Sequence, residues 1–314
     1  MTALVTGGAG FIGSNLVDAL LDRGERVVVV DDLSTGRRRN LDGALARGAE
    51  LHELDVRDAS ALGAVFEQAR PQLVFHLAAQ IDVRRSVADP AADERVNVEG
   101  TINVLAAAHA AGARRVVYSA TGGAVYGEAE QVPTPEDAPA RPLAPYGQGK
   151  LAGEGYCALF TRLHGLSTVA LRYANVYGPR QDPLGEGGVI AIFCGCVTDG
   201  RTPTIYGDGR QTRDYVYVGD VVAANLRAAE LDATGPVNVG TGVETSVLDL
   251  VEAFRGLEQG EAFAPVHASA RPGEVLRSCL DAARARELLG WDPQVSLAEG
   301  LRRTLATVSA AGAR

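Results

Sequence analysis

The chain of 314 residues can bury a large core, and its length predicts two domains or one large α/β unit with an added lobe. Hydrophobic residues make up 46% and charged residues 22%, which is typical of a soluble globular protein. The net charge of −9 argues against general affinity for nucleic acid or for an anionic membrane. An anionic substrate would therefore need locally placed arginines.

The cysteines indicate a reducing compartment. The four of them form no Cys-x-x-Cys pair and no dense disulfide framework. The first apolar segment, residues 3–5, is too short for a signal peptide or a membrane span and runs straight into glycines. We therefore expect a cytoplasmic protein with free thiols and without a metal site.

Strand-like and helix-like segments alternate through the first half of the chain. Short apolar runs predict buried strands at 3–6, 27–30, 51–54, 73–76, 116–119 and 168–171. Helical spacing of apolar residues lies between them, at 11–23, 59–69, 93–111 and 146–163. This alternation predicts an α/β fold with a doubly wound parallel sheet of the Rossmann type and helices on both faces.

The rhythm changes after about residue 173. The later segments are a loop at 178–188, a helix at 189–197, a strand at 213–218, a turn at 219–220 into another helix, a strand at 237–240, and helices at 246–255 and 297–309. We expect residues 1–173, with about 213–240, to form the sheet domain. Residues 174–212 and 241–314 would form a smaller mixed α/β lobe over the carboxyl edge of the sheet, where open α/β folds bind ligands.

A glycine pattern follows the first predicted strand and opens the first predicted helix. Gly7, Gly10 and Gly13 give the spacing Gly-x-x-Gly-x-x-Gly. Glycines permit a tight turn and let backbone N–H groups approach a pyrophosphate at the helix N-terminus. In this strand–turn–helix context the pattern predicts that the chain binds a dinucleotide.

Acidic residues at the ends of the next strands favour NAD over NADP. Asp31 and Asp32 end the second strand, where a carboxylate accepts hydrogen bonds from the adenosine ribose and repels a 2′-phosphate. The basic run 37–39 could hold that phosphate, but it lies further into a loop. Asp55 ends the third strand and is well placed to meet the adenine amino group.

Tyr146 and Lys150 give the clearest chemical signal. Residues four apart on a helix share a face, so the sequence places an ammonium beside a phenol. A nearby positive charge favours phenolate over phenol, which would make Tyr146 a proton acceptor. Next to a bound dinucleotide, the pair predicts oxidoreductase-type chemistry on an alcohol.

Together, these motifs resemble the extended short-chain dehydrogenase/reductase superfamily, and within it the nucleotide-sugar branch, especially the UDP-glucose 4-epimerases. The superfamily motifs are residues 6–13, Asp55-Val56, His76-Leu-Ala-Ala-Gln80, Asn97-Val-Glu-Gly-Thr101, Tyr118-Ser-Ala-Thr121, and Tyr146 with Lys150. Those of the branch are Arg172-Tyr-Ala-Asn-Val-Tyr-Gly-Pro-Arg-Gln-Asp182 and Arg213-Asp-Tyr-Val-Tyr-Val218. The resemblance spans the chain from Met1 to about Arg303.

The resemblance implies a role for each matching residue. Tyr146 would be the base for a sugar 4-hydroxyl, Thr121 would orient that hydroxyl, and Lys150 would help to form the phenolate and hold the nicotinamide ribose. Arg213 and Arg271 would bind a diphosphate. The implied NAD contacts are Gly7, Gly10, Phe11, Ile12, Gly13, Asp31, Asp32, Asp55, Val56, Leu77, Ala78, Ala79, Gln80, Asn97, Ser119, Tyr146, Lys150 and Tyr173. The implied UDP-sugar contacts are Thr121, Tyr146, Asn175, Gly188, Val189, Tyr206, Arg213, Arg271, Glu274 and Ser278.

The implied reaction inverts C4 of a UDP-hexose, with UDP-glucose and UDP-galactose as the first expectation. Hydride would pass from C4 to NAD and return to the other face of a 4-keto sugar, so there is no net redox change. Ser278 is small and would leave room for an N-acetyl group, which keeps UDP-GlcNAc open. Asp182 speaks mildly against UDP-glucuronate, although Arg84 or Arg85 could pair with its carboxylate.

Rival functions stay open at this point. A 4,6-dehydratase of this branch carries an Asp-Glu pair after the catalytic Thr, whereas Thr121 is followed by Gly122-Gly123-Ala124, so dehydration would lack its general acid. A 4-reductase or a decarboxylase would share most of the site. A non-catalytic NAD-binding regulator would tolerate loss of the tyrosine and lysine. The resemblance also implies a homodimer through the helices at 93–111 and 146–163.

Overall fold

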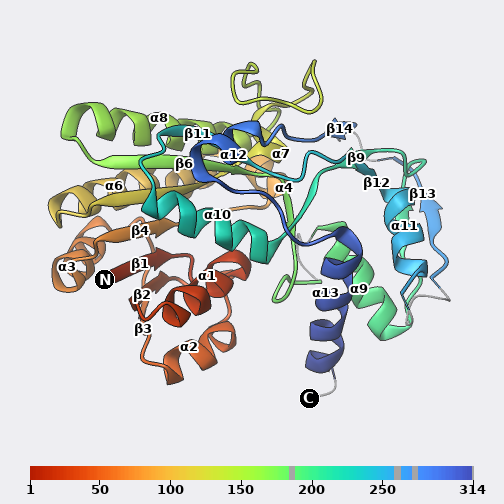
Figure 1. Ribbon diagram of the computed structural model, residues 1–314, viewed down its shortest axis with the longest axis horizontal. Coiled ribbons are helices and arrows are strands. Elements are labelled where there is room, and N and C mark those ends of the chain that lie inside the picture. Colours follow the sequence, from red (N-terminus) through yellow and green to blue (C-terminus); the bar gives the residue numbers. More distant parts are fainter. Residues whose placement is uncertain (184–187, 258–262, 271–274, 313–314) are drawn as a thin grey trace.

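A parallel sheet of seven strands runs through the larger part of the computed structural model, which describes residues 1–183, 188–257, 263–270 and 275–312 (Figure 1). The strand order is β11-β6-β5-β4-β1-β2-β3. The strands are β1 (Thr2–Thr6), β2 (Arg26–Asp31), β3 (Glu50–Glu53), β4 (Leu73–His76), β5 (Arg115–Thr121), β6 (Ser167–Tyr173) and β11 (Gly235–Val239). The order reverses between β1 and β4, and a doubly wound sheet binds its ligand in the crevice at such a point. The predicted fold class is confirmed.

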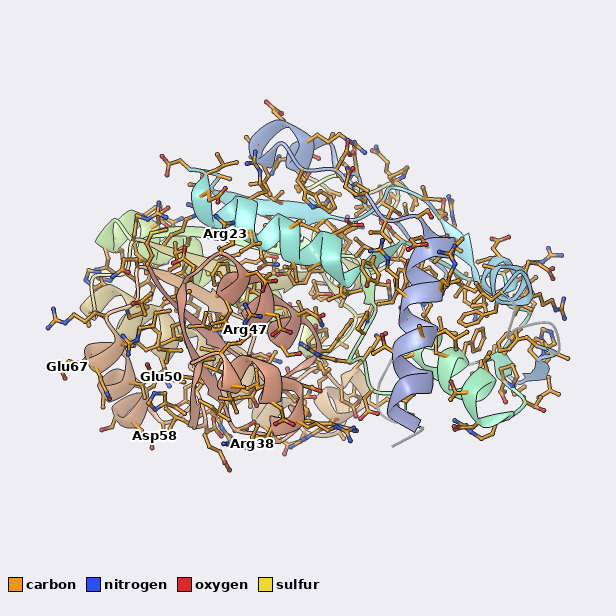
Figure 2. All side chains as sticks on the ribbon, turned by 60° about the horizontal axis from the view of Figure 1, so that its bottom comes forward. Arg23, Arg38, Arg47, Glu50, Asp58 and Glu67 are labelled. Atoms are coloured by element: carbon orange, nitrogen blue, oxygen red, sulfur yellow. The ribbon has the colours of Figure 1, made fainter. Side chains whose placement is uncertain are left out.

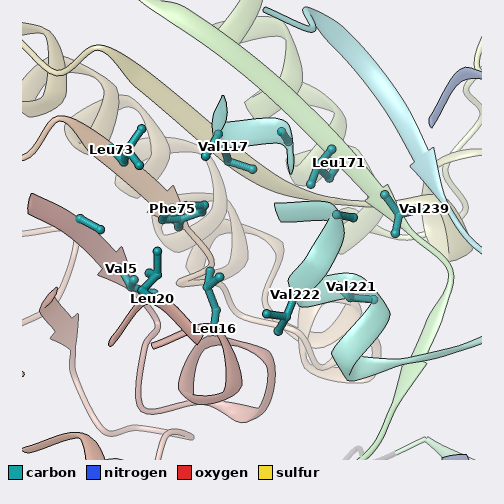
Figure 3. Close-up of a cluster of buried hydrophobic side chains, with 14 of the residues drawn as sticks. Val5, Leu16, Leu20, Leu73, Phe75, Val117, Leu171, Val221, Val222 and Val239 are labelled. Carbon is teal, nitrogen blue, oxygen red and sulfur yellow. The ribbon is translucent and has the colours of Figure 1, made fainter. Parts of the chain in front are cut away.

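Helices cover both faces of this sheet. One face carries α1 (Phe11–Asp22), α2 (Asp42–Ala46), α10 (Val218–Glu230) and α12 (Ala283–Leu289), and the other carries α3 (Ala59–Ala69), α6 (Gly100–Ala110) and α8 (Pro145–His164). Alternate strand residues point to opposite faces: Val5 packs with Leu16 and Leu20 of α1, whereas Leu4 faces the helices on the other side. Figure 3 shows the first of these clusters, where Val221 and Val222 of α10 meet Leu171 and Val239. Because both faces are buried, these strands read as continuous apolar runs.

The remaining elements form the lobe and the connections around the carboxyl edge. The lobe contains β7 (Asn175–Tyr177), α9 (Val189–Asp199), β8 (Thr204–Tyr206), β9 (Thr212–Arg213), β10 (Tyr215–Tyr217), β12 (Thr245–Ser246), α11 (Val247–Arg255), β13 (Val266–Ala268), β14 (Arg277–Ser278) and α13 (Leu297–Gly312). Phe11 and Ile12, at the start of α1, pack against the hydrophobic cluster of the lobe. The lobe therefore lies next to the carboxyl end of β1 (Figure 1). The division of the chain into two domains stays a prediction.

The predicted helix at 93–111 is confirmed, but it is not α-helical throughout. The structure has α4 (Val83–Ala88), α5 (Pro90–Glu94), a π-helical turn (Arg95–Glu99) and then α6. The side chain of Asn97 inside this turn bonds the backbone of Gln80, and the Thr101 hydroxyl bonds the carbonyl of Asn97. π-Helical turns are rare in proteins, and those that occur often lie at functional sites.

The predicted strand at 213–218 is wrong as a single unit, because it breaks at Asp214. β9 pairs with β12 and β14, whereas β10 pairs with β7, so the two halves belong to different sheets. The Asp214 carboxylate accepts hydrogen bonds from Thr241 and Gly242 and fixes the break. The expected turn at 219–220 lies instead within the first turn of α10.

Charged side chains of both signs lie on the outer surface of the sheet domain. Arg38, Arg47, Glu50 and Glu67 are examples (Figure 2). Among the described residues, no helix is both long enough and apolar enough to cross a membrane.

Candidate active site

The turn between β1 and α1 has room for glycine and for little else. Gly7 has φ +70°, and a Cβ placed on it would lie 2.6 Å from the backbone N of Ala78. A Cβ on Gly13 would lie 2.1 Å from the carbonyl O of Gly7. The turn therefore brings the N-terminus of α1, which begins after Gly10, against the carboxyl ends of β1 and β4. This cradle fits the pyrophosphate of a dinucleotide, because unpaired N–H groups and the helix dipole favour an anion there.

The two acids at the end of β2 have different environments. The carboxylate of Asp31 is buried and accepts hydrogen bonds from the N–H groups of Ala9 at 2.8 Å and Leu33 at 2.9 Å. Burial raises its pKa, partly offset by these two bonds. Asp32 is exposed, and its Oδ1 accepts a hydrogen bond from the Ser34 hydroxyl at 2.6 Å. Asp31 thus ties the strand end to the glycine turn, while Asp32 is accessible.

The basic run 37–39 lies next to the acids, but its first member is already paired. Arg37 forms an ion pair with Asp182, which approaches from the loop before α9. This contact joins the sheet domain to the lobe and removes Arg37 as a free phosphate ligand. Asp55 is paired as well, with Arg57 at 2.9 Å (Nε to Oδ2), and this hydrogen bond holds the pKa of the Asp55 carboxyl low.

The loop after β4, which carries residues 77–80, is held by an amide clamp. Asn97 accepts a hydrogen bond from the N–H of Gln80 at 3.1 Å and donates one to the carbonyl of Gln80 at 3.0 Å. His76, at the end of β4, bonds Thr6 and Thr101 through its two ring nitrogens, and burial lowers its pKa to about 3. The imidazole is therefore a neutral structural group.

Tyr146, Lys150 and Thr121 come together at the carboxyl edge of the sheet. Tyr146 lies in the first turn of α8, where Pro145 occupies an N-terminal position that tolerates a missing N–H. Thr121 is the last residue of β5, and its hydroxyl hydrogen-bonds the Tyr146 phenol. Lys150 is 3% exposed and donates from Nζ to the carbonyl of Ser119 at 2.8 Å.

The electrostatics of this trio correct the expectation drawn from the sequence. Burial raises the pKa of Tyr146 to about 12, Asp93 adds to the rise, and the hydrogen bond from Thr121 opposes it. Lys150 is not among these influences, since its ammonium bonds Ser119 and lies 5.0 Å from the ring centroid of Tyr118. Burial lowers the pKa of Lys150 to about 8. The protein groups alone therefore favour a neutral phenol.

Ser119 and Tyr173 lie on adjacent strands beside this trio. The Tyr173 hydroxyl donates to Asn225 Oδ1 at 2.9 Å and also hydrogen-bonds Ser119. Burial raises the pKa of Tyr173, so its phenol stays neutral. The carbonyl of Ser119 anchors Lys150, which links both residues to the proposed nicotinamide end of the site.

Other residues predicted to contact a UDP-sugar lie in the lobe. Asn175 is close to Thr121, because a Cβ on Gly123 would lie 3.6 Å from Asn175 Oδ1 and 4.0 Å from Thr121 Oγ1. Arg213 is in register with Ser278 across β9 and β14. Tyr206 ends β8, and Gly188 caps α9 at Val189. The predicted ligands Arg271 and Glu274 lie outside the described residues.

Two buried groups of this region gave no functional signal in the sequence. Asp214 accepts hydrogen bonds from Thr241 and Gly242 and a further one from the N–H of Leu280 at 3.3 Å. It therefore ties the start of β10 to the segments that follow β11 and β14. Arg172 makes a two-point ion pair with Glu154 of α8, at 2.9 and 2.7 Å, and donates to the Tyr126 hydroxyl at 2.8 Å. Both residues lie inside motifs of the nucleotide-sugar branch, 172–182 and 213–218, but neither motif indicated these contacts.

Comparisons with known proteins show the family to which the chain belongs. Residues 3–240 match the protein family described as the NAD dependent epimerase/dehydratase family. The UDP-glucose 4-epimerase of Mycolicibacterium smegmatis is 50% identical over 307 residues, which is 97% of each chain. The solved UDP-glucose 4-epimerase of Thermotoga maritima with UDP-glucose has a TM-score of 0.95 at 45% identity and covers 99% of each chain. That of Thermus thermophilus in complex with NAD has a TM-score of 0.89 at 42% identity and covers 98% of each chain.

A dinucleotide turn, a tyrosine–lysine–threonine trio and a lobe over the sheet edge define an enzyme of the extended short-chain dehydrogenase/reductase type, as the sequence predicted. The chain belongs to the NAD dependent epimerase/dehydratase family. It is an epimerase, and hence an isomerase, with NAD as its cofactor.

Proposed function

We propose that this epimerase acts at C4 of a UDP-hexose and interconverts UDP-glucose and UDP-galactose. The observation that carries the proposal is the placement of Tyr146 and Thr121 at the same sheet edge as the glycine turn, with Lys150 anchored beside them. The names of the similar proteins support the substrate class.

The residues that would hold NAD follow the sheet edge. The glycine turn would hold the pyrophosphate, Asp32 or Asp31 the adenosine ribose, and Lys150 the nicotinamide ribose. When bound, NAD supplies a hydride acceptor for the sugar C4 and a positively charged ring that favours the phenolate.

Tyr146 would accept the proton of the sugar 4-hydroxyl, and Thr121 would orient that hydroxyl. A base is most effective when its pKa lies near the working pH. Lowering the pKa of Tyr146 from about 12 to near 7 requires roughly 7 kcal/mol of preferential phenolate stabilisation. Lys150 does not lower the pKa of the phenol in the protein alone, so most of this stabilisation would come from the positively charged ring of bound NAD.

Two features bear on the sugar itself. Ser278 lies beside Arg213, and its short side chain supports UDP-GlcNAc as a second candidate. Asp182 forms an ion pair with Arg37. Position 182 therefore holds an acid that is already paired, and no arginine that could bind the carboxylate of UDP-glucuronate.

The dehydratase alternative is further disfavoured by the packing after Thr121. A Cβ on Gly122 would lie 2.4 Å from Leu280 Cδ1, so an acidic side chain at that position would require Leu280 to move. A 4-reductase, a decarboxylase and a non-catalytic regulator stay as alternatives for the substrate assay to separate.

The test is an incubation of the purified protein with UDP-galactose, UDP-glucose, UDP-GlcNAc and UDP-glucuronate, with products resolved by NMR. We expect UDP-galactose and UDP-glucose to interconvert without net NADH formation. Net NADH consumption would indicate a reductase, CO₂ release from UDP-glucuronate a decarboxylase, and no turnover of any sugar a regulator. Each of these outcomes would contradict the proposal.

Replacing Arg213 by alanine is expected to weaken binding of UDP as well as of UDP-sugars. Arg213 is half-buried and its Nη1 bonds the carbonyl of Thr212 at 2.8 Å, which orients the guanidinium. A charge-assisted hydrogen bond contributes about 1.5–3 kcal/mol, so we expect a loss of roughly tenfold to a hundredfold in UDP affinity by calorimetry. Arg201→Ala is the matched control, since Arg201 is in the same lobe and pairs with Asp199 on the surface. Unchanged UDP affinity in Arg213→Ala would contradict the phosphate assignment.

We also propose a cytoplasmic homodimer formed through α6 and α8. Leu163, near the end of α8, is 66% exposed, which supports a partner on that face. Light scattering after size exclusion tests the dimer, and a monomeric mass would contradict it. The free thiols of the four buried cysteines are compatible with a reducing cytoplasm.

A further inference from the structure

Asp93 is a buried carboxylate to which neither the sequence nor the proposed mechanism gives a role. It lies in α5, is 1% exposed, and accepts a hydrogen bond at Oδ1 from Gln80 Nε2 at 2.6 Å. Its other oxygen, Oδ2, is also buried and has no hydrogen-bond partner within the described residues. Because a buried charge without a full set of partners is destabilising, such a group needs an explanation.

The unpartnered oxygen faces the catalytic helix. A Cβ placed on Gly149, between Tyr146 and Lys150 in sequence, would lie 3.5 Å from Asp93 Oδ2 and 3.2 Å from the Cβ of Asn97. The glycine therefore lets the carboxylate approach the turn of α8 that carries both catalytic residues. Even an alanine at 149 would be in tight contact with Asn97 of the π-turn.

Lys150 is surrounded by few other charges. From its own helix it faces Glu154 and Cys157, and from β5 it faces the Tyr118 ring and the carbonyl of Ser119. From β4 it faces His76, which is neutral. Glu154 is held in its ion pair with Arg172, so its charge is largely compensated.

We propose that Asp93 is a positioning residue that keeps the Lys150 ammonium charged inside the buried site, and so sets the upper pH limit at which the lysine can act. The proposal rests on the role of Lys150 in the proposed function. Burial lowers the pKa of Lys150, and Asp93 is the foremost group that opposes this fall. The same carboxylate raises the pKa of Tyr146, so it also delays ionisation of the phenol until further positive charge is bound.

The test is the pH dependence of NAD affinity in Asp93→Asn, measured by calorimetry from about pH 6 to 10, a range that spans the Lys150 pKa of about 8. Wild-type protein should lose NAD affinity as Lys150 deprotonates. In Asp93→Asn we expect this alkaline midpoint to fall by about one pH unit or more, because the ammonium loses the negative charge that most favours it. Glu94→Gln is the matched control: Glu94 is the next residue of α5 and also lies near Gly149, yet it is not among the groups that influence Lys150.

A second substitution separates this role from a purely structural one. In a Lys150→Met background, Asp93→Asn should cause no further shift of the midpoint. An unchanged midpoint in folded Asp93→Asn, or the same shift with Lys150 already removed, would overturn the proposal. If Asp93→Asn does not fold, ¹⁵N NMR of the Lys150 Nζ in wild-type protein decides: an ammonium at pH 7 supports the proposal and a neutral amine overturns it. Because the readout is NAD binding, failure of the sugar assay would leave this test intact.

Discussion

Tyr146→Phe is expected to lower kcat for UDP-galactose epimerisation by about 10²–10⁴-fold, the range typical of a lost general base. The substitution removes only the phenolic oxygen, and the ring stays packed at the start of α8. Thr121 would keep its place at the end of β5 but would have no phenol to bond. NAD binding should stay essentially unchanged, because the glycine turn, Asp31 and Lys150 are untouched.

The measurement is kcat from initial rates, with NAD content determined on the same sample. Tyr156→Phe provides the matched control, since Tyr156 lies on the same helix and packs against the hydrophobic cluster on that face of the sheet. That variant should retain wild-type turnover. Turnover by Tyr146→Phe at the wild-type rate would show that another group accepts the proton.

Arg172→Ala is expected to lower the free energy of unfolding by about 3–5 kcal/mol, which is the range for breaking a buried ion pair. The side chains of Arg172 and Glu154 are only 6% and 8% exposed, so the substitution leaves the Glu154 carboxylate buried and uncompensated. Tyr126 loses a donor at the same time. Because Glu154 lies two turns after Tyr146 on α8, the loss should also loosen the catalytic helix.

Urea denaturation measures this effect, and a surface pair calibrates it. Arg26 and Glu50 form an ion pair whose side chains are 47% and 42% exposed, so Arg26→Ala should cost at most about 1 kcal/mol. The double variant Arg172→Met with Glu154→Leu should recover part of the lost stability, since it removes both buried charges. If Arg172→Ala were no more destabilising than Arg26→Ala, the pair would not stabilise α8.

The sheet and the cofactor turn were predictable because their signals are local. Short apolar runs indicate the buried strands, and the glycine pattern of the turn lies within seven residues, from Gly7 to Gly13. The end of β5 and the start of α8 follow from the same pattern. The trio of Thr121, Tyr146 and Lys150 could therefore be assigned before its geometry was known.

Features that depend on long-range contacts could not be predicted in this way. The pairing of Arg37 with Asp182 joins residues far apart in sequence, and the break at Asp214 depends on Thr241 and Leu280. Helical spacing correctly put Tyr146 and Lys150 in successive turns, but it did not show that the ammonium would turn to Ser119. The pKa of the Tyr146 phenol is raised mainly by burial, and the degree of burial depends on the whole fold.

The last strand of the main sheet has a consequence for how the protein is made. β11 pairs with β6, and α10 and α12 cover one face, yet the ribosome synthesises all three only after the first segment of the lobe, from β7 to β10. A nascent chain ending near Tyr173 therefore exposes the hydrogen-bonding edge of β6 together with an uncovered apolar surface. Exposed strand edges promote association between chains, so premature termination in this interval should yield insoluble product rather than a smaller working nucleotide-binding unit.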